Sequence, residues 1–417
     1  MGFYPILATL LKIKYWKYMH TIGRIKDTHI LLLQGPIGFF FKRLDKELRK
    51  AGAKTYRIGF NMGDSIFSYG DNYTPYRATT KEWRIFVEKF VIQHKISKVF
   101  LFGDCRFYQK IVIEIAKKYA IEIYVFEEGY VRPHYITLEK YGVNGHSHLP
   151  KEASFYHNLP INTIEEPQDS TPNPISNWSI VIAYYFIAKL FHSFYKNYKH
   201  HREYSASKEL FFGLRSLARK VFYTQRDKKY LKNIQANLSK KYFFIPLQTH
   251  NDFQILQHSH YGSLEKFIIE VLESFAKYAP KEYILLFKHH PIDRGRKNYT
   301  DFITDQAKQV NIETRILILH DIHLPTCLKH AKGTVTINST VGFSSLYHKT
   351  PAITLGNAIY DIEGLTAKNQ TLKEFWQNPS IPDIKLFNKY KNYIIQKTQL
   401  NGSFYGQFPL ELQEINL

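Results

Sequence analysis

The sequence predicts an α/β protein with two Rossmann-like domains that face a central cleft and are joined by a helical connector. Short apolar runs alternate with helix-length amphipathic segments in residues 28–149 and again from residue 242 onward, which is typical of parallel sheets. At 417 residues the chain is long for one domain, and its 44% hydrophobic residues allow two sizeable cores. We expect the N-terminal domain at 1–160, the connector at 161–240 and the C-terminal domain at 241–417.

The expected strands are short apolar runs that stop at glycine, proline or charged residues. One expected helix places Phe40, Leu44 and Leu48 at four-residue spacing and ends at a glycine. Strands are expected at His29–Gly35, Lys98–Asp104, Ile121–Gly129, Tyr242–Gln248, Tyr283–Lys288, Ile316–Leu319, Gly333–Ile337 and Ala352–Gly356. Helices are expected at Phe39–Gly52, Tyr108–Ala120 and Ser263–Tyr278.

The segment between the two α/β halves is polar and proline-rich at 160–174 and strongly apolar at Trp178–Tyr195. The apolar stretch is about the shortest that could span a bilayer and contains a lysine and a histidine. We therefore expect a helix that packs in the domain or lies in a membrane interface. Eleven Lys and Arg residues follow within 196–232, and this pairing predicts either a patch for anionic lipid or an ordinary solvated helix face. Residues 1–20 could likewise lie on a membrane surface or form a packing helix.

The composition favours a cytosolic protein with anionic ligands. The formal net charge of +21, from 57 Lys+Arg against 36 Asp+Glu, attracts nucleic acid, anionic lipid or phosphorylated substrates. The sequence has no RNP1 motif and no zinc-finger spacing, so nucleic acid is not expected as a partner. Cys105 and Cys327 are far apart and predict no disulfide framework. No histidine follows HExxH or another ligand spacing, so no metal is expected.

Polar or glycine-containing residues follow the expected strands, where open parallel sheets bind their ligands. Six such segments end apolar runs, which is more than coincidence would supply. They are Gln34–Gly35–Pro36, Gly103–Asp104, Glu127–Glu128–Gly129, the run from Gln248 through Asn251 to Asp252, His289–His290–Pro291 and Asn338–Ser339–Thr340.

Two of these segments suit a phosphate group. A helix that starts at Ser339 or Thr340 would present hydroxyls and free amides to an anion, and the alternative is that Ser339 only caps the helix. In KHHPIDRGRK, His290 could donate a hydrogen bond to a leaving phosphate and Arg294 could bind it bidentately. The alternative for this second segment is a basic surface loop.

Three carboxylates are candidates for group-transfer chemistry. Asp252 lies just past a strand and could act as a nucleophile at a sugar's anomeric carbon, or it could only cap a helix. Glu127 or Glu128 could serve as general base for an acceptor hydroxyl. Arg132 would keep one of these glutamates ionised or form a structural ion pair with it.

The motifs at these positions resemble the capsule polysaccharide biosynthesis/export family of Gram-negative bacteria. They occur in order from Leu31 to Gly406, so the resemblance covers nearly the whole chain. The matching segments are LLLQGPIGFF, FGDCR, FEEGYVRPHYITLEKYGVNGHS, QTHNDFQI, FKHHPIDRGRK, HDIHLPT, TINSTVGFSSLYHKTPAITLG and TQLNGSFYG. Together these motifs are highly specific.

The resemblance implies a GT-B-like pair of domains and the activity of a single-module retaining β-Kdo transferase. Such an enzyme would use CMP-β-Kdo as donor substrate, without metal or cofactor, and add the first Kdo of the capsule linker to (lyso)phosphatidylglycerol. It would be a cytoplasmic, peripheral protein on the inner face of the inner membrane. An anionic phospholipid, the membrane surface and other capsule assembly and export proteins are its expected partners.

The resemblance also implies roles for individual residues. Asp252 matches the family's catalytic aspartate, His290 the histidine near the donor phosphate, and Ser339 with Thr340 the phosphate-contacting segment. The family's Glu-Asp-Gly stands here as Glu127–Glu128–Gly129, which leaves open which glutamate is the acid/base. The expected catalytic residues are Asp252, His290, Glu127 and Glu128, and the expected substrate-binding residues are Gln34, Gly35, Arg132, Gln248, Asn251, Arg294, Asn338, Ser339 and Thr340.

Two other functions stay open from the sequence. A teichoic-acid-type transferase would use a CDP-linked donor, so it would turn over CDP-glycerol but not CMP-Kdo. A non-catalytic export adaptor would bind lipid-linked capsule and the transporter, and loss of its gene would leave the Kdo linker intact. The ordered polar strand ends favour an enzyme, because an adaptor does not need Asp252, His290 and Ser339 to converge.

Overall fold

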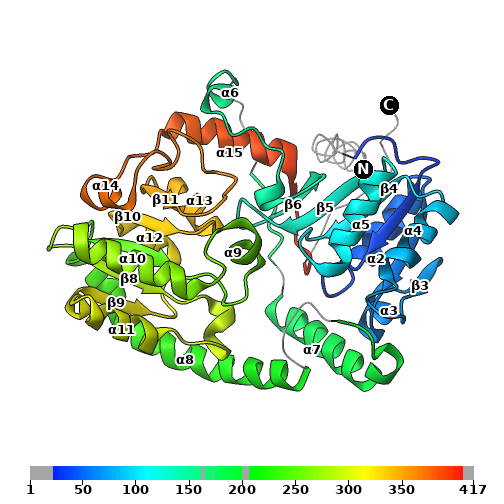
Figure 1. Cartoon of the computed structure of the whole chain (residues 1–417), viewed down its shortest axis with the longest axis horizontal. Helices are drawn as coiled ribbons and strands as arrows, with labels where there is room; N and C mark the ends of the chain where they lie inside the picture. Colours follow the sequence, from blue (N-terminus) through cyan, green and yellow to red (C-terminus); the bar gives the residue numbers. More distant parts are fainter. Residues whose placement is uncertain (1–21, 161–163, 165, 172, 200–205, 407–417) are drawn as a thin grey trace, which may run out of the picture. The chain divides into compact units, whose positions relative to one another are not determined.

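The computed structural model describes residues 22–160, 164, 166–171, 173–199 and 206–406, and the chain forms two compact units (Figure 1). Unit 1 comprises Met1–His148, Ile164–Ala206 and Tyr393–Leu417, and unit 2 comprises Leu149–Thr163 and Ser207–Asn392. The connector expected at 161–240 is therefore divided between the units, and the C-terminal segment belongs with the N-terminal one. The C-terminal segment belongs to unit 1 because its strand β12 (Gln399–Asn401) pairs antiparallel with β6 (Tyr135–Lys140) at the edge of the unit 1 sheet.

The sheet of unit 1 has seven strands in the order β12-β6-β5-β4-β1-β2-β3. Strands β1 to β5 are parallel, and β6 and β12 are antiparallel to their neighbours. The remaining strands are β1 (His29–Leu33), β2 (Lys54–Gly59), β3 (Tyr73–Pro75), β4 (Lys98–Phe102) and β5 (Glu122–Glu128). The helices of this unit include α2 (Phe40–Lys50), α3 (Met62–Ser68), α4 (Trp83–Gln93), α5 (Phe107–Lys118) and α7 (Pro174–Leu190).

Alternate strand residues of unit 1 enter two separate cores, because successive side chains of a strand point to opposite faces. In β1, Leu31 and Leu33 pack with side chains of α4 and α5, whereas Ile30 and Leu32 pack with side chains of α2. Phe404 from the C-terminal segment belongs to the second core and meets Phe40 edge-to-face with ring centroids 4.9 Å apart. The C-terminal segment is thus part of the unit 1 core.

The sheet of unit 2 has five parallel strands in the order β11-β10-β7-β8-β9. They are β7 (Tyr242–Pro246), β8 (Ile284–Lys288), β9 (Ile316–Leu319), β10 (Gly333–Thr336) and β11 (Ala352–Thr354). The other helices are α6 (Ala153–His157), α8 (Ala206–Ala236), α9 (Phe253–His258), α10 (Leu264–Tyr278), α11 (Thr300–Gln309), α12 (Leu324–His330), α13 (Thr340–Tyr347), α14 (Leu372–Gln377) and α15 (Ile384–Thr398). One face packs on α10, α11 and α14, and the other on α8 and α12 (Figure 1).

Both sheets share one Rossmann-like strand order, in which the connection reverses between the first and fourth parallel strands. The reversal lies between β1 and β4 in unit 1 and between β7 and β10 in unit 2. Ligands of open α/β sheets bind at the carboxyl ends of the strands beside such a reversal. The predicted α/β class with two Rossmann-like units is confirmed, and the cleft between them stays a prediction.

The apolar stretch expected at Trp178–Tyr195 is the latter part of α7 and a 3-10 helix at His192–Tyr195. Among the helices that the structure describes, none is both long and apolar enough for a bilayer span. Residues 1–20, for which a membrane-surface segment or a packing helix was predicted, lie outside the described part of the chain.

Candidate active site

The candidate site of unit 2 is built on a buried glutamine at the strand reversal. Gln248 follows β7, and its Nε2 donates to Oδ2 of Asp252 at 3.2 Å and to Oδ1 of Asn338 at 3.1 Å. Its Oε1 accepts from the backbone N–H of Asn338 at 3.3 Å. The amide is only 5% exposed, so these bonds fix its orientation. The structure thus joins three residues that the sequence placed in two separate segments.

Asp252 is at once a helix cap and an oriented carboxylate. Its Oδ1 accepts the backbone N–H of Gln254 at 2.9 Å and so caps α9. Burial raises the pKa of Asp252, the bonds from Gln254 and Gln248 lower it in part, and the charge of Asp293 raises it further. A raised pKa makes the ionised carboxylate more basic, and two fixed oxygens hold it in one orientation. The cap therefore does not exclude the predicted role as nucleophile.

The segment after β10 forms the helix start that the sequence predicted. Ser339 caps α13, its Oγ accepting from the backbone N–H of Val341 at 3.2 Å, and the Tyr360 hydroxyl donates to the Ser339 carbonyl. A Cβ at Gly342 would lie 2.1 Å from that hydroxyl oxygen, so only glycine allows the tyrosine this close. Asn338 Nδ2 donates to the carbonyls of Gln254 and His258, at 2.9 and 3.3 Å. Asn338 therefore positions the turn, and the predicted binding of an anion by the first-turn amides of α13 stays a prediction.

The loop after β8 holds His290 in a defined tautomer. The Nδ1 of His290 accepts the backbone N–H of Ile292 at 3.2 Å, so a neutral ring carries its proton on Nε2. Arg294 is placed differently from the sequence prediction. Its guanidinium forms a bidentate pair with Asp321, at 2.6 Å from Nε and 2.7 Å from Nη2, and so anchors the loop to the end of β9. Its predicted contact with phosphate stays a prediction.

Asp293 is a site residue that the sequence analysis missed. It is 2% exposed, and its carboxylate contacts the backbone N–H and the Nδ1 of His250, both at 2.8 Å. This pair ties the His290 loop to the loop that carries Asn251 and Asp252. The available signal was that both loops follow strands, and β7 and β8 turn out to be neighbours. Asn251 itself is partly buried.

The loop after β8 begins at a stack of three aromatic rings, those of His289, His320 and Tyr223. His320 stacks on His289 with centroids 4.0 Å apart and on Tyr223 of α8 at 3.9 Å. Burial lowers the pKa of His289 to about 4 and that of His320 to about 2, the latter also through nearby positive charges. Asp227 of α8 accepts the backbone N–H groups of His320 and Asp321 at 2.7 and 2.9 Å. The stack and these bonds attach the loop region to α8.

In unit 1, the predicted glutamate pair ends strand β5. Adjacent strand residues point to opposite faces, so Glu127 and Glu128 have different surroundings. Glu127 is partly buried, and its Oε2 accepts from Asn144 Nδ2 at 3.4 Å. Burial raises the pKa of Glu127 to about 7, with a further increase from the charge of Glu128 and a decrease from that of Arg106.

Glu128 is the more exposed of the two glutamates. Partial desolvation of its carboxylate by the surrounding protein raises the pKa of Glu128, and the charge of Arg132 lowers it. Arg132 donates from Nε to the Gly129 carbonyl at 3.1 Å, so it is held at the strand end next to the pair. The structure thus places Arg132 near Glu128, and the predicted catalytic roles of the two glutamates stay predictions.

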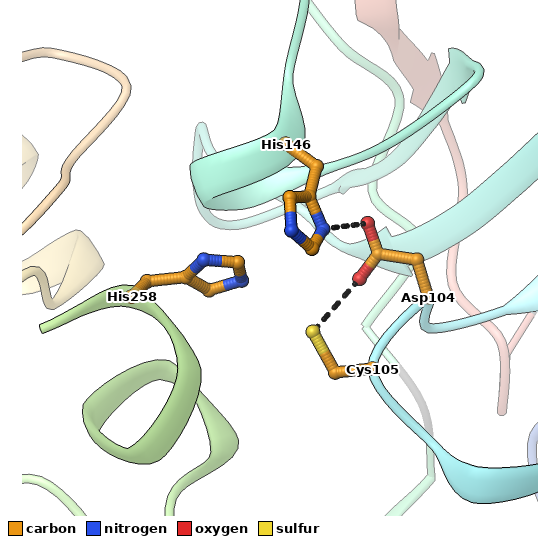
Figure 2. A group of neighbouring side chains, drawn as sticks. All are labelled: Asp104, Cys105, His146 and His258. Carbon is orange, nitrogen blue, oxygen red and sulfur yellow. Dashed lines mark hydrogen bonds and ion pairs between the residues drawn. The ribbon is translucent and has the colours of Figure 1, made fainter. Parts of the chain in front are cut away.

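Another acidic residue of unit 1, Asp104, follows β4 beside the strand reversal. Asp104 is 4% exposed, and its Oδ2 accepts from the backbone of Val143 and contacts His146 Nδ1, both at 3.1 Å. Its Oδ1 accepts from Cys105 Sγ at 3.2 Å, and Figure 2 shows the carboxylate between the two side chains. His258, also drawn there, is a residue of unit 2 whose carbonyl accepts from Asn338.

Asp104, Cys105 and His146 are the residues here whose atom types could hold a metal. Their ligand-type atoms lie within 4.8 Å of one another. However, burial raises the pKa of the Cys105 thiol, and the thiolate is the form that binds metal. In the structure the aspartate bonds to both neighbours instead, and the expectation of no metal stays a prediction.

The two remaining predicted residues have internal roles in unit 1. Gln34 Nε2 donates to Asp64 Oδ2 at 3.0 Å and to the Tyr198 hydroxyl at 2.9 Å. A Cβ at Gly35 would lie 2.6 Å from the ring of Phe41, so glycine permits close packing there. The predicted contact of both residues with substrate stays a prediction.

Comparison with known proteins finds relatives whose names all refer to capsule polysaccharide. Residues 97–405 match the family model described as capsule polysaccharide biosynthesis protein. The chain is 38% identical over 375 residues to the capsule polysaccharide export protein KpsS of Escherichia coli, covering 90% of this chain and 96% of that protein. It is 38% identical over 396 residues to the capsule polysaccharide modification protein LipB of Neisseria meningitidis serogroup A, covering 91% and 92%. Among solved structures it resembles the β-Kdo 2,7 transferase KpsC of Thermosulfurimonas dismutans, with TM-score 0.41, 12% identity and coverage of 87% and 89%.

Proposed function

We propose, since this chain belongs to the capsule polysaccharide biosynthesis protein family, that it is a retaining β-Kdo glycosyltransferase of capsule assembly. In this proposal the donor is CMP-β-Kdo, and the acceptor is (lyso)phosphatidylglycerol, which receives the first Kdo of the capsule linker. The observation that carries the proposal is the chain of hydrogen bonds joining Asp252, Gln248 and Asn338 at the strand reversal of unit 2. It places an oriented carboxylate beside the start of α13.

Asp252 is the proposed nucleophile. In the first step its Oδ2 would attack the anomeric carbon of Kdo, and the bond to the phosphate oxygen of CMP would break. In the second step the acceptor hydroxyl would attack the same carbon, lose its proton to a base and release Asp252. Two inversions give net retention at the anomeric carbon.

The departing CMP phosphate needs groups that stabilise negative charge. His290 would donate from Nε2, the atom that carries the proton when Nδ1 accepts from Ile292. The first-turn amides of α13, together with the Ser339 and Thr340 hydroxyls, would bind the phosphate at a helix start. Arg294 would act indirectly, because its pair with Asp321 holds the His290 loop. These groups need no metal or cofactor.

Glu127 is the proposed base for the acceptor hydroxyl, and Glu128 is not. The pKa of Glu127, raised to about 7 by burial, suits a group that must accept a proton near neutral pH. Its Oε2 is oriented by Asn144, whereas Glu128 points to the other face of β5.

The proposed acceptor places the protein at the cytoplasmic face of the inner membrane as a peripheral protein. A net charge of +21 attracts anionic headgroups to such a protein. Other capsule assembly and export proteins would be neighbours there, because a lipid-linked product must pass to later steps.

The test is to incubate the purified protein with CMP-Kdo and short-chain phosphatidylglycerol and to measure the mass of the product by mass spectrometry. We expect a mass increase of one Kdo, and no product from Asp252→Asn. The matched control is Asp305→Asn, which alters an exposed aspartate of α11. Turnover of CDP-glycerol but not CMP-Kdo would overturn the donor assignment, and full activity of Asp252→Ala would overturn the role of Asp252.

A further inference from the structure

Helix α7 presents an apolar face to solvent although its opposite side is fixed by polar bonds. Ile182, Phe186 and Leu190 recur every four residues on one side and are 48%, 66% and 63% exposed. Phe194, in the following 3-10 helix, is 56% exposed. An ordinary surface helix shows the reverse pattern, with apolar residues inward. The exposed face therefore needs an explanation beyond folding.

The inward side of α7 is held by Tyr184. Its hydroxyl donates to Asp64 Oδ1 at 2.7 Å and accepts from Asn61 Nδ2 at 2.8 Å. A Cβ at Gly63 would lie 2.6 Å from the Tyr184 ring, so helix α3 and α7 pack closely. Because this side is fixed, α7 cannot turn its apolar face inward.

Helix α8 in unit 2 repeats this arrangement. Its inward arginines donate to loop carbonyls, Arg215 to Gly295 at 2.7 Å and to Arg296 at 2.8 Å, and Arg219 to Arg294 at 3.0 Å. The first four of its outward apolar side chains recur at spacings of three to four residues, which place them on one side of a helix, and the fifth directly follows the fourth in sequence. These side chains are Phe211, Leu214, Leu217, Val221 and Phe222, all between 51% and 68% exposed.

In the described segments 174–199 and 206–236, both faces carry exposed lysines and no exposed carboxylate. Residues 174–199 contain no Asp or Glu. The two acids of α8 are both used internally, Glu209 in an ion pair with Arg296 and Asp227 as a fully buried acceptor. Five lysines of α8 are exposed, and so are three beside the α7 face. They are Lys208, Lys220, Lys228, Lys229 and Lys232, and Lys189, Lys196 and Lys199.

We infer that these two faces, here named the α7 face and the α8 face, dock on an anionic lipid bilayer. Exposed Phe and Leu side chains enter the headgroup boundary while lysines around them meet acidic headgroups. A second copy of this chain is disfavoured as the occupant, because it would bring lysines against lysines. The inference rests on the proposed function only in that a lipid acceptor has to be reached at a membrane surface.

The test is co-sedimentation of the full chain with vesicles of phosphatidylglycerol and phosphatidylcholine in equal parts. Three double variants are compared with the parent: Phe186→Glu with Leu190→Glu, Leu214→Glu with Val221→Glu, and Lys228→Glu with Lys229→Glu. Each should weaken vesicle binding at least about tenfold, and the parent should bind pure phosphatidylcholine weakly. The matched controls are Ile85→Glu and Ile381→Glu, at 60% and 81% exposed positions outside both faces.

Transfer to a soluble short-chain acceptor separates this inference from the proposed function. Variants that lose vesicle binding but keep this transfer and their thermal unfolding midpoint support the docking faces. Vesicle binding that depends on these residues supports them even if the parent transfers no Kdo. Failure of the parent to bind the mixed vesicles, equal binding by all variants, or a change of oligomeric state in place of a loss of vesicle binding would overturn the inference.

Discussion

Gln248 holds Asp252 through a 3.2 Å hydrogen bond from its amide Nε2 to the carboxylate Oδ2. The same nitrogen donates to Asn338 at 3.1 Å, so both amide protons are used. The side chain of a buried glutamine therefore sets the position of the proposed nucleophile relative to the start of α13. Gln248 acts as a positioning residue in this arrangement.

Replacing Gln248 should impair transfer in two distinguishable ways. Gln248→Ala removes a hydrogen bond to a charged group, worth about 1.5–3 kcal/mol, so kcat should fall about tenfold to a hundredfold. Gln248→Glu places a second carboxylate next to Asp252, which should raise the pKa of Asp252 and move the acid limb of the kcat profile to higher pH. The measurement is transfer to the short-chain acceptor across pH.

The control for this pair is Gln235→Ala, at an exposed position near the end of α8. It should leave both kcat and the pH profile unchanged. An unshifted profile for Gln248→Glu, with the protein folded, would show that Gln248 does not act on the charge of Asp252.

The two glutamates of β5 should differ sharply in their effect on transfer. Glu127→Gln removes the proposed base and should reduce kcat by about 10²–10⁴-fold, whereas Glu128→Gln, the matched control, should change it less than about tenfold. A base must be ionised, and the pKa of Glu127 is about 7. The rate should therefore fall as pH drops below about 7 and level off above it. Equal losses in the two variants would contradict the assignment.

The sequence was sufficient for elements whose signal is local. Apolar runs bounded by glycine or charge predicted β5 and β7, and the polar residues at their ends predicted Glu127, in the last part of β5, and Asp252, after β7, as strand-end groups. Strand β2 was missed because Arg57 interrupts its apolar pattern. The structure shows why an arginine is tolerated there. Arg57 is 2% exposed, and its Nη2 forms an ion pair with Oδ2 of Asp45 at 3.5 Å. From sequence alone, a charged residue that forms a buried ion pair cannot be distinguished from a charged residue on the surface.

Partners distant in sequence were beyond a local reading. Arg294 offered a positive charge for phosphate, but Asp321 is its partner across the end of β9. Gln34 ended a strand as predicted, yet its amide donates to Asp64 and to Tyr198, a residue 164 positions away. The pairing of β12 with β6 also joins segments that lie 262 positions apart in the sequence. Such contacts depend on the tertiary fold, and no spacing rule encodes them.

Tyr184→Phe should destabilise the attachment of α7 without affecting the transfer chemistry. The change removes a 2.7 Å hydrogen bond to the buried Asp64, and a buried acceptor that loses its donor costs about 1–3 kcal/mol. Urea denaturation should show this loss in the free energy of unfolding. Tyr69→Phe, at a 68% exposed position, is the control and should unfold like the parent. An unchanged unfolding midpoint for Tyr184→Phe would show that the bond contributes nothing to stability.

The stack of His289 and His320 should make the protein sensitive to acid. The pKa of His320 is about 2 in the folded protein, well below the ordinary value of about 6.5 that it regains on unfolding. Only the unfolded chain takes up the proton, so stability is lost as pH falls through about 6.5. Between about pH 8 and pH 5 the loss from this one group is about 2 kcal/mol.

His320→Phe retains a ring in the stack and removes the titrating group. The variant should be less stable than the parent at about pH 8, because Arg226 loses the ring nitrogen that it contacts at 2.9 Å. Its free energy of unfolding should nevertheless fall about 2 kcal/mol less than that of the parent when pH is lowered to about 5. Urea denaturation at both pH values measures the difference, with the exposed His260→Phe as control. If the free energy of unfolding fell equally for variant and parent between the two pH values, His320 would take up its proton in the folded protein. Burial between His289 and Tyr223 would then not keep the ring neutral.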